Sequence, residues 1–254
     1  MHTLIDNPRP ELQHFNTTEQ GTEAWWSQRR NIFSGSKIAN LCFIKNQEER
    51  QTYYEEVFGI RPRKPLDEDA MKRVKYGKDH EIDGVKNALA RCQGMHMWEV
   101  GFEKHPHKVH GNWFGSSPDG VVMWPHKNPQ NPWAALEIKC STKTSNGKNI
   151  PHAGIPYYYM GQLHAEMKCM PLPNQCNWCV FVSWSQTKCK IWTVNFSTAY
   201  WDILWDFACD FTCNDTSWAS FANKQAAFIK ASKEMCRQAT ALHPRGGFDT
   251  IQFD

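Results

Sequence analysis

The sequence of 254 residues lacks any long uninterrupted run of apolar side chains. A membrane-spanning helix needs about 20 such residues, so we expect no transmembrane segment. The first 20 residues are polar, with two prolines and several charges, and they contain no hydrophobic stretch typical of a secretory signal. These absences predict an intracellular protein, and they do not distinguish the nucleus from the cytoplasm.

The sequence also lacks the marks of a disulfide-stabilised scaffold. Its ten cysteines are spread over a long chain, whereas disulfide-rich domains are short and secreted, so we expect reduced thiols. Cys176 and Cys179 have the spacing of a zinc-binding pair, but no second closely spaced pair accompanies them, and a tetrahedral zinc site needs four ligands. We interpret them as small buried side chains, and a zinc-organised binding protein is a distant alternative.

There is little excess of charge of either sign. The formal net charge is +3, which is too small to indicate a nucleic-acid partner by itself. Basic residues are clustered locally, however, with seven lysines and arginines within residues 61–78. Such runs are usually solvated surfaces, and they indicate nucleic acid only beside a site that processes phosphate.

The pattern of apolar residues and turn formers predicts an α/β protein. A proline-rich connector over 60–66 precedes a long helix over 68–92. The apolar positions of that helix recur at helical spacing, which predicts that one face packs on the core; they are Met71, Val74, Ile82, Val85 and Leu89. Further helices are expected over 22–42, with an interruption near 33–36, over 156–170 and over 198–238.

Strands are expected over 97–102, 109–114, 117–123 and 134–139, and over 178–185 and 190–196, where they form a hairpin. This order predicts one domain over 21–240 with a mixed central sheet flanked by helices. Residues 1–20 would be an N-terminal extension and residues 241–254 a tail.

The residues that carry chemistry lie on two consecutive expected strands. Asp119 opens one strand, and Glu137-Ile138-Lys139 ends its hairpin partner. Because side chains alternate along a strand, Glu137 and Lys139 project from one face while Leu136 and Ile138 face the core. Two neighbouring carboxylates repel each other unless a divalent cation neutralises them, and Mg²⁺ prefers oxygen ligands. An adjacent lysine can orient water or offset phosphate charge, as phosphodiester hydrolysis requires.

Each of these residues is ambiguous by itself. An isolated Asp-Gly is usually a turn, and Glu-x-Lys at the end of a strand is usually a surface edge. The combination of Pro-Asp, an apolar strand, a turn-rich loop and apolar-Glu-apolar-Lys is the PD-(D/E)xK pattern of metal-dependent nucleases. We therefore expect a nuclease domain with a restriction-endonuclease-like PD-(D/E)xK core.

Four separated segments resemble the lambda-exonuclease-like branch of that superfamily, the YqaJ-type viral recombinases or alkaline exonucleases. Residues 25–36 are similar to the family's opening Trp-x₃-Arg-x₆-Ser motif, and residues 77–81 to its Gly-Lys-x-x-Glu motif. The strand pair with Asp119, Glu137 and Lys139 resembles its metal and lysine motifs, and residues 159–162 resemble its Tyr-Met-x-Gln motif.

The resemblance implies a Mg²⁺-dependent exonuclease that degrades linear duplex DNA from the 5′ end, with Mn²⁺ as a substitute. In the two-metal mechanism that we expect, Lys139 activates or orients the attacking water. The expected metal ligands are Asp119, Glu137 and the backbone carbonyl of Ile138. The remaining catalytic residues are Glu81 and Gln162, and the expected DNA contacts are Arg29, Ser36, Ser117, Lys143 and Tyr159.

The resemblance further implies a ring-shaped homotrimer around duplex DNA, and such exonucleases often work with a single-strand annealing protein in recombination. One departure is that Cys140 is followed by Ser141 instead of proline, which leaves the path of the loop over 141–150 open. No match extends beyond residue 210. Two alternatives remain open: an endonuclease of restriction or repair type on the same fold, and a non-catalytic module that binds DNA or a recombinase.

Overall fold

The computed structural model describes residues 12–109, 114–171, 176–243 and 251–252. Its helices are α1 (Glu23–Arg29), α2 (Gly35–Leu41), α3 (Gln47–Val57), α4 (Glu68–Arg91), α5 (Met160–Cys169), α6 (Thr198–Cys213) and α7 (Trp218–Ala241), with a 3-10 turn η2 (Tyr157–Tyr159) before α5. Its strands are β1 (Phe33–Ser34), β2 (His96–Trp98), β3 (Glu103–Lys104), β4 (Phe114–Ser116), β5 (Gly120–Met123), β6 (Trp133–Cys140), β7 (Thr144–Ser145), β8 (Lys148–Asn149), β9 (Trp178–Trp184), β10 (Lys188–Asn195) and β11 (Ile251–Gln252).

Within the described part of the chain, the centre is a six-stranded sheet in the order β11-β10-β9-β6-β5-β2. The β5–β6 hairpin pairs antiparallel with Gly120 opposite Leu136, and β9 pairs antiparallel with β10. Between these two hairpins β6 runs parallel to β9. The predicted mixed sheet and both predicted hairpins are therefore confirmed.

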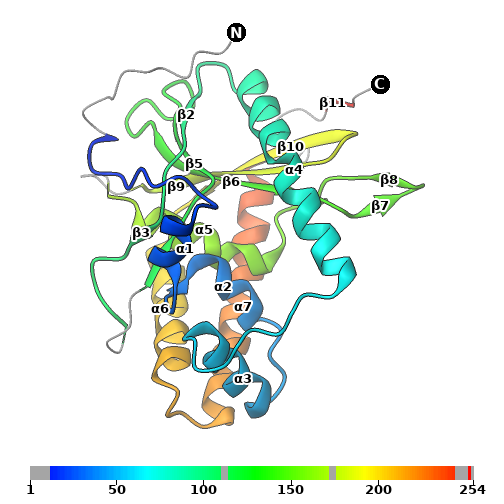
Figure 1. Cartoon of the computed structure of the whole chain (residues 1–254). Helices are drawn as coiled ribbons and strands as arrows, with labels where there is room; N and C mark the ends of the chain where they lie inside the picture. Colours follow the sequence, from blue (N-terminus) through cyan, green and yellow to red (C-terminus); the bar gives the residue numbers. More distant parts are fainter. Residues whose placement is uncertain (1–11, 110–113, 172–175, 244–250, 253–254) are drawn as a thin grey trace.

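Helices cover both faces of the sheet at β6 (Figure 1). On one face α4 packs against β6, β9 and β10, and on the other α5 packs against β6 and β9. Side chains on both faces of β6 are therefore covered by helices: Ile138 is 5% exposed and Glu137 is 1% exposed. The sequence had indicated only one buried face for this strand, because alternation does not reveal a helix on the second face.

The predicted apolar stripe of α4 is only half correct. Met71, Val74 and Ile82 are exposed, whereas Val85 and Leu89 pack against the core. The physical reason is the length of the helix: its C-terminal half crosses the sheet, and its cyan N-terminal end in Figure 1 extends past the sheet on the side of the β7–β8 hairpin. Apolar periodicity predicts which face of a helix is buried, but it does not show how far along the helix the sheet that buries it extends.

Several element boundaries differ from expectation. The strand expected over 97–102 ends at Trp98, and the one expected over 117–123 begins only at Gly120 because Pro118 cannot donate a ladder hydrogen bond. The strand expected over 109–114 lies largely outside the described residues. The helix expected over 198–238 is two helices, since Asn214 adopts a left-handed conformation (φ 57°) that ends α6. Helix α3 was not predicted.

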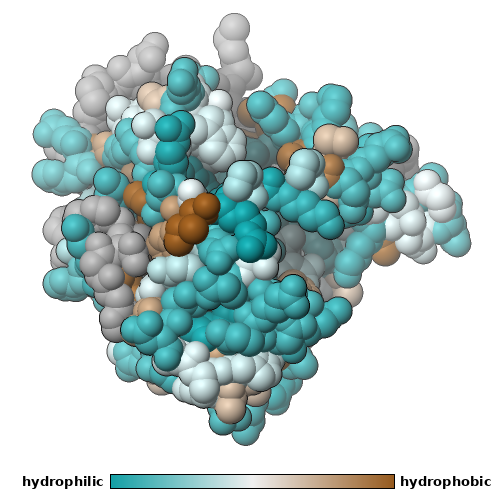
Figure 2. All heavy atoms as spheres, turned by 60° about the horizontal axis from the view of Figure 1, so that its bottom comes forward, coloured by the Kyte–Doolittle hydropathy of each residue, from teal (hydrophilic) through white to brown (hydrophobic). Residues whose placement is uncertain are grey.

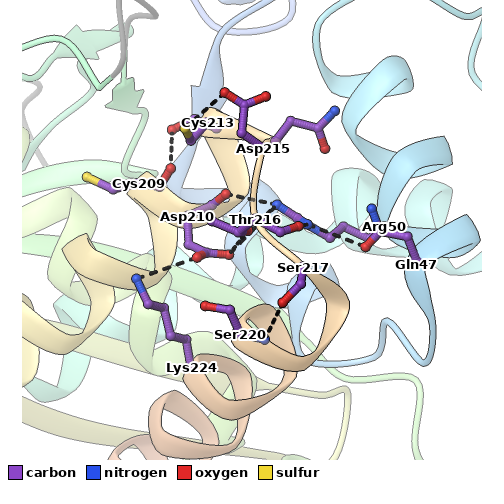
Figure 3. Close-up of polar contacts among 12 residues, drawn as sticks. Gln47, Arg50, Cys209, Asp210, Cys213, Asp215, Thr216, Ser217, Ser220 and Lys224 are labelled. Carbon is purple, nitrogen blue, oxygen red and sulfur yellow. Dashed lines mark hydrogen bonds and ion pairs between the residues drawn. The ribbon is translucent and has the colours of Figure 1, made fainter.

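A buried ion pair ties α3 to the C-terminal end of α6 (Figure 3). The Arg50 and Asp210 side chains are fully buried, with Nη2 3.7 Å from Oδ2. Arg50 also donates to the carbonyl oxygens of Asp210 at 3.0 Å and Thr216 at 2.7 Å. A buried charge must be compensated in this way to be tolerated, so these contacts fix the position of α3.

The two chain ends are partly attached to the domain. Within the expected extension 1–20, Phe15 is buried and Asn16 donates from its backbone to the Glu103 carboxylate at 2.6 Å; residues 1–11 lie outside the described residues. Within the expected tail, β11 pairs with β10, and 244–250 and 253–254 are likewise outside. No described helix is both long and apolar enough to cross a membrane. The face shown in Figure 2 is mostly hydrophilic with small separated apolar patches.

Candidate active site

The β5–β6 hairpin brings the two predicted carboxylates together. The register of Gly120 opposite Leu136 puts Asp119 beside Glu137, and the Asp119 Oδ2 atom accepts a hydrogen bond from the Ile138 backbone N–H at 2.7 Å. Lys139 Nζ forms an ion pair with Glu137 Oε1. The same oxygen accepts a hydrogen bond from Gln162 Nε2 at 2.6 Å. Five predicted site residues, with Ile138 among them, therefore form one connected cluster.

Local structure holds the segment before Asp119 in place. The Gln20 side-chain amide donates to the carbonyl oxygens of Pro118 at 2.7 Å and Val100 at 2.9 Å. Gln20 belongs to the stretch that the sequence indicated was an extension, so its contribution was not anticipated. The brace fixes the chain at the point where it enters β5.

The electrostatics of the cluster are those of crowded carboxyl groups. Burial, followed by the charge of Glu137, raises the pKa of Asp119 well above its ordinary value, and the same two causes raise the pKa of Glu81. Burial alone would lower the pKa of Lys139, but Glu137 and Asp119 outweigh it and raise that pKa. Negative charge thus accumulates at one place, and a bound cation would relieve it.

The donor set fits a divalent metal ion. Glu137 Oε2 is buried and has no hydrogen-bond partner among the described residues, and a carboxylate oxygen left in this state is costly unless a cation binds it. Asp119, Glu137 and the Ile138 carbonyl offer oxygen atoms only, which suits Mg²⁺. No cluster of three or more His, Cys, Asp or Glu side chains is preformed within the described ranges. Water molecules would therefore complete the coordination, as is usual for Mg²⁺.

The predicted phosphate-binding residues meet beside this cluster. Arg29 Nη2 donates to Ser36 Oγ at 3.0 Å, and Trp25 Nε1 donates to Ser117 Oγ at 3.1 Å. The Arg29 guanidinium lies 4.0 Å from the centre of the Trp25 ring. Burial lowers the pKa of Arg29 to about 10, against the opposing charges of Glu137 and Asp119. Arg29 is thus cationic at neutral pH and within electrostatic range of the carboxylates.

A close approach of backbones creates this arrangement. Strand β1 runs parallel to β4, with Ser34 opposite Gly115, which carries the start of α2 to the segment that ends at Ser117. At Gly35 a Cβ atom would come within 2.6 Å of Ser116 Oγ and 3.0 Å of Ala165 Cβ. Glycine is therefore required where α2 begins.

The remaining predicted residues surround an open cleft. It is lined by Arg73, Val74, Gly77, Glu81, Asp119, Ile138, Lys139, Cys140, Ser141, Thr142, Lys143, His152, Tyr158 and Tyr159. Glu81 lines this cleft from α4, and the Tyr159 ring centre lies 5.0 Å from Lys139 Nζ. Arg29, Ser36 and Ser117, the predicted phosphate contacts, are not among the residues that line this cleft.

The path of residues 141–150, which the sequence left open, is that of a further small hairpin. Strands β7 and β8 pair antiparallel around Asn146 (φ 52°) and Gly147 (φ 74°), the sequence and geometry of a tight two-residue turn. The hairpin projects from the sheet beyond α4 (Figure 1). Lys143 and Lys148 are exposed on it, and Lys143 also lines the cleft.

Two polar residues at the site were missed by sequence analysis. Glu166 of α5 is fully buried and accepts a hydrogen bond from Gln162 Nε2 at 2.8 Å. His152 is buried beside the cleft, where its backbone N–H and Nδ1 both contact Ser183 Oγ, at 2.9 and 2.8 Å. A signal for Glu166 existed: it follows Gln162 by four residues and therefore shares its helix face.

The cysteine pair lies away from the cleft. Cys176 and Cys179 are free and buried, and the Cys176 thiol donates to the Trp178 carbonyl at 2.8 Å and accepts from the Ala135 N–H at 3.2 Å. Burial raises the pKa of Cys176 to about 12. These contacts are those of packed thiols.

Comparison with known proteins identifies a family. The model of the YqaJ-like viral recombinase domain matches residues 24–171, which include every predicted site residue. No curated protein sequence matches. Among solved structures, the alkaline exonuclease LHK-Exo from Laribacter hongkongensis is similar, at 18% identity and a TM-score of 0.49 over 88% of this chain and 99% of that chain. The same exonuclease in complex with dAMP gives 19% identity and a TM-score of 0.48 over the same shares.

Proposed function

Because the chain belongs to the YqaJ-like viral recombinase domain family, we propose that it is a metal-dependent nuclease that degrades linear double-stranded DNA from the 5′ end. The observation that carries this proposal is the pairing of Asp119 with Glu137 next to Lys139, with a buried Glu137 oxygen that has no hydrogen-bond partner among the residues described. A site with two carboxylates and a lysine supplies what phosphodiester hydrolysis needs.

Asp119, Glu137 and the Ile138 carbonyl would hold Mg²⁺, which when bound polarises the phosphoryl oxygen and lowers the pKa of coordinated water. Glu137 and Asp119 raise the pKa of Lys139 in the metal-free site, and next to a bound cation Lys139 would activate or orient the attacking water and offset charge on the phosphoryl group. Glu81 lines the same cleft as Asp119 and Lys139 and would contact metal-bound water.

The preference for a 5′ end rests on Arg29, Ser36 and Ser117. A guanidinium offers a planar fork of donors to two phosphate oxygens, and the two hydroxyl groups add further donors. A terminal phosphate carries more negative charge than an internal diester, so this pocket favours an end. Its position outside the cleft lining but beside Asp119 suits a phosphate adjacent to the scissile bond.

The duplex itself would lie along the cleft mouth. Arg73 on α4 and Lys143 beside the hairpin both line the cleft, and no acidic residue occurs within 141–152. Cationic side chains along a cleft neutralise DNA phosphates without reading the base sequence. Digestion would accordingly depend on salt concentration more than on base sequence.

The proposal is tested by incubating the protein with linear and covalently closed circular duplexes of one sequence, with and without Mg²⁺. We expect only the linear form to be degraded, only with Mg²⁺, and with end-labelled nucleotides released first from 5′ ends. Asp119→Asn, which removes one ligand charge at nearly constant volume, is the matched control for contaminating nucleases. Rapid cutting of closed circles would indicate an endonuclease, and binding of DNA without hydrolysis would indicate a non-catalytic module.

A further inference from the structure

Glu166 is a carboxyl group where an apolar side chain would be expected. It lies in α5 between the fully buried residues Ala165 and Met167, and is itself 0% exposed. Burying a carboxyl costs free energy unless it gains hydrogen bonds, yet Glu166 Oε2 accepts no hydrogen bond from an N–H or O–H group within the described part of the chain. Packing alone therefore does not account for this residue.

Glu166 contacts Glu137 itself and also the side chain that supports Glu137. Gln162 Nε2 lies 2.6 Å from Glu137 Oε1 and 2.8 Å from Glu166 Oε1. A primary amide nitrogen carries two hydrogen atoms, so one is donated to each carboxyl group. With both donated, the orientation of the amide is determined.

Glu166 disfavours the opposite orientation of the Gln162 amide. If the Gln162 amide rotated by half a turn, its oxygen would face Glu137 Oε1, and two acceptors would oppose each other. Without Glu166 only the bond to Glu137 disfavours that rotation. With Glu166 the rotation breaks two bonds in a buried site, where each unmade bond is costly.

We propose that Glu166 is a positioning residue that holds the Gln162 amide nitrogen toward Glu137, so that Glu137 Oε1 is held between Gln162 and Lys139 and Oε2 is left for a metal ion. This inference rests on the proposed metal-dependent nuclease. Residues that orient a metal ligand from behind typically affect metal affinity or activity by about 10–100-fold.

The test uses the full chain and two readouts: Mn²⁺ binding to DNA-free protein by isothermal titration calorimetry, and kcat and KM on a linear duplex. Glu166→Ala should weaken Mn²⁺ binding and lower kcat by about 10–100-fold with little change in KM, because the ligand loses its orientation while DNA contacts persist. Glu166→Met fills the same space without an acceptor, and it should behave alike if the alanine variant does not fold.

Glu166→Gln is the decisive variant. Its side-chain oxygen can still accept from Gln162, so both readouts should stay within about threefold of wild type, as expected when a neutral hydrogen bond replaces a charged one. If Glu166→Gln were as impaired as Glu166→Ala, Glu166 would act through its charge or as a ligand, and the inference would be wrong. Equally, wild-type Mn²⁺ binding in Glu166→Ala would overturn it.

His164 supplies a matched control on the same helix. It is also 0% exposed, and its ring nitrogens contact the Met160 carbonyl at 3.0 Å and the Ser197 N–H at 3.3 Å, away from Glu137. His164→Ala should lower the thermal midpoint without weakening Mn²⁺ binding. If the wild-type protein does not hydrolyse DNA, the proposed function fails first; if it does and the Glu166 variants match it, only this inference fails.

Discussion

Gly84 of α4 lies directly against Ile138 of β6, and a Cβ atom at residue 84 would come within 2.6 Å of Ile138 Cγ2. The helix can approach the strand closely only because this position has no side chain. Glu81, one helical turn earlier, is carried to the cleft wall by the same contact. Ile138 is itself the expected carbonyl ligand, so helix packing and metal binding meet at one residue.

Gly84→Val should therefore separate α4 from β6. We expect a loss of about 1–3 kcal/mol in the free energy of unfolding, typical of overpacking, and a fall in Mg²⁺-dependent cleavage of about 100-fold for a shift near 1 Å. Chemical denaturation and initial rates measure both. Gly77→Ala, on the same helix with nothing within 4 Å of the added Cβ, is the stability control and should equal or exceed wild type.

Asp119→Ala, Glu137→Ala and Lys139→Ala should each reduce cleavage by more than about 100-fold, since each removes several kcal/mol of transition-state stabilisation. Far-ultraviolet circular dichroism should show an unchanged fold. Near wild-type turnover in Mg²⁺ for any one variant would remove that residue from the mechanism.

Arg29 should control the preference for phosphorylated ends. We expect a 5′-phosphorylated linear duplex to be degraded faster than the 5′-hydroxyl form. Arg29→Ala should remove most of that preference, a change of about 10-fold for a charge-assisted hydrogen bond. Arg29→Lys should restore only part, because an ammonium lacks the planar fork. An unchanged ratio in Arg29→Ala would place the phosphate elsewhere.

Metal binding should release protons from the carboxyl cluster. The pKa values of Asp119 and Glu166 are raised, mainly by burial and by Glu137, so above about pH 4 the folded metal-free protein binds more protons than the unfolded chain. Its stability therefore falls as pH rises through this window toward the raised pKa values. Mg²⁺ relieves the repulsion, so its stabilising effect should grow with pH.

Thermal melts at pH 6.5 and 8.5, with and without Mg²⁺, measure this effect. Buried His152 and His164, whose pKa values burial lowers to about 4, change stability in the opposite sense, but only below about pH 6.5. In Glu166→Gln the pH dependence of the Mg²⁺ effect should be smaller. A larger Mg²⁺ effect at pH 6.5 than at 8.5 would contradict the prediction.

The Arg50–Asp210 pair should govern stability and leave the chemistry untouched. Arg50→Met leaves the buried Asp210 with Lys224, whose Nζ lies 3.5 Å from Asp210 Oδ1, as its remaining cationic partner (Figure 3), and we expect a loss of up to about 3–5 kcal/mol in unfolding free energy. Arg61→Ala removes a pair in which Arg61 is 52% exposed, and should cost less than about 1 kcal/mol. Equal midpoints in urea for the two variants would show that burial does not matter here.

The sequence predicted those site residues whose positions follow from local geometry. Asp119, Glu137 and Lys139 are related by strand alternation and one hairpin, and both can be recognised from short-range patterns. The positions of Arg29 and Ser36 relative to them came from resemblance alone, because the contact depends on β1 pairing with β4 across about 80 residues.

What the sequence could not predict depends on which surfaces become covered. A single charged side chain in a helix is ordinarily solvated, so the sequence did not predict the burial of Glu166 or Arg50. Conversely, it predicted burial of the apolar residues Met71, Val74 and Ile82, which are exposed. In each of these cases a segment that is distant in the sequence decides whether the side chain is buried or exposed.

The parallel neighbour of β6 lies outside the family-matched segment, and this affects the timing of assembly during synthesis. Strand β9 sets Phe181 opposite Glu137 and Ser183 opposite Lys139. Residues 24–171 therefore contain the predicted site residues but not the strand that holds their register. On a ribosome, which releases the N-terminal part first, the carboxylates cannot reach their final alignment until β9 has emerged. The nascent chain should thus remain unable to cut nucleic acid until most of the protein has been made.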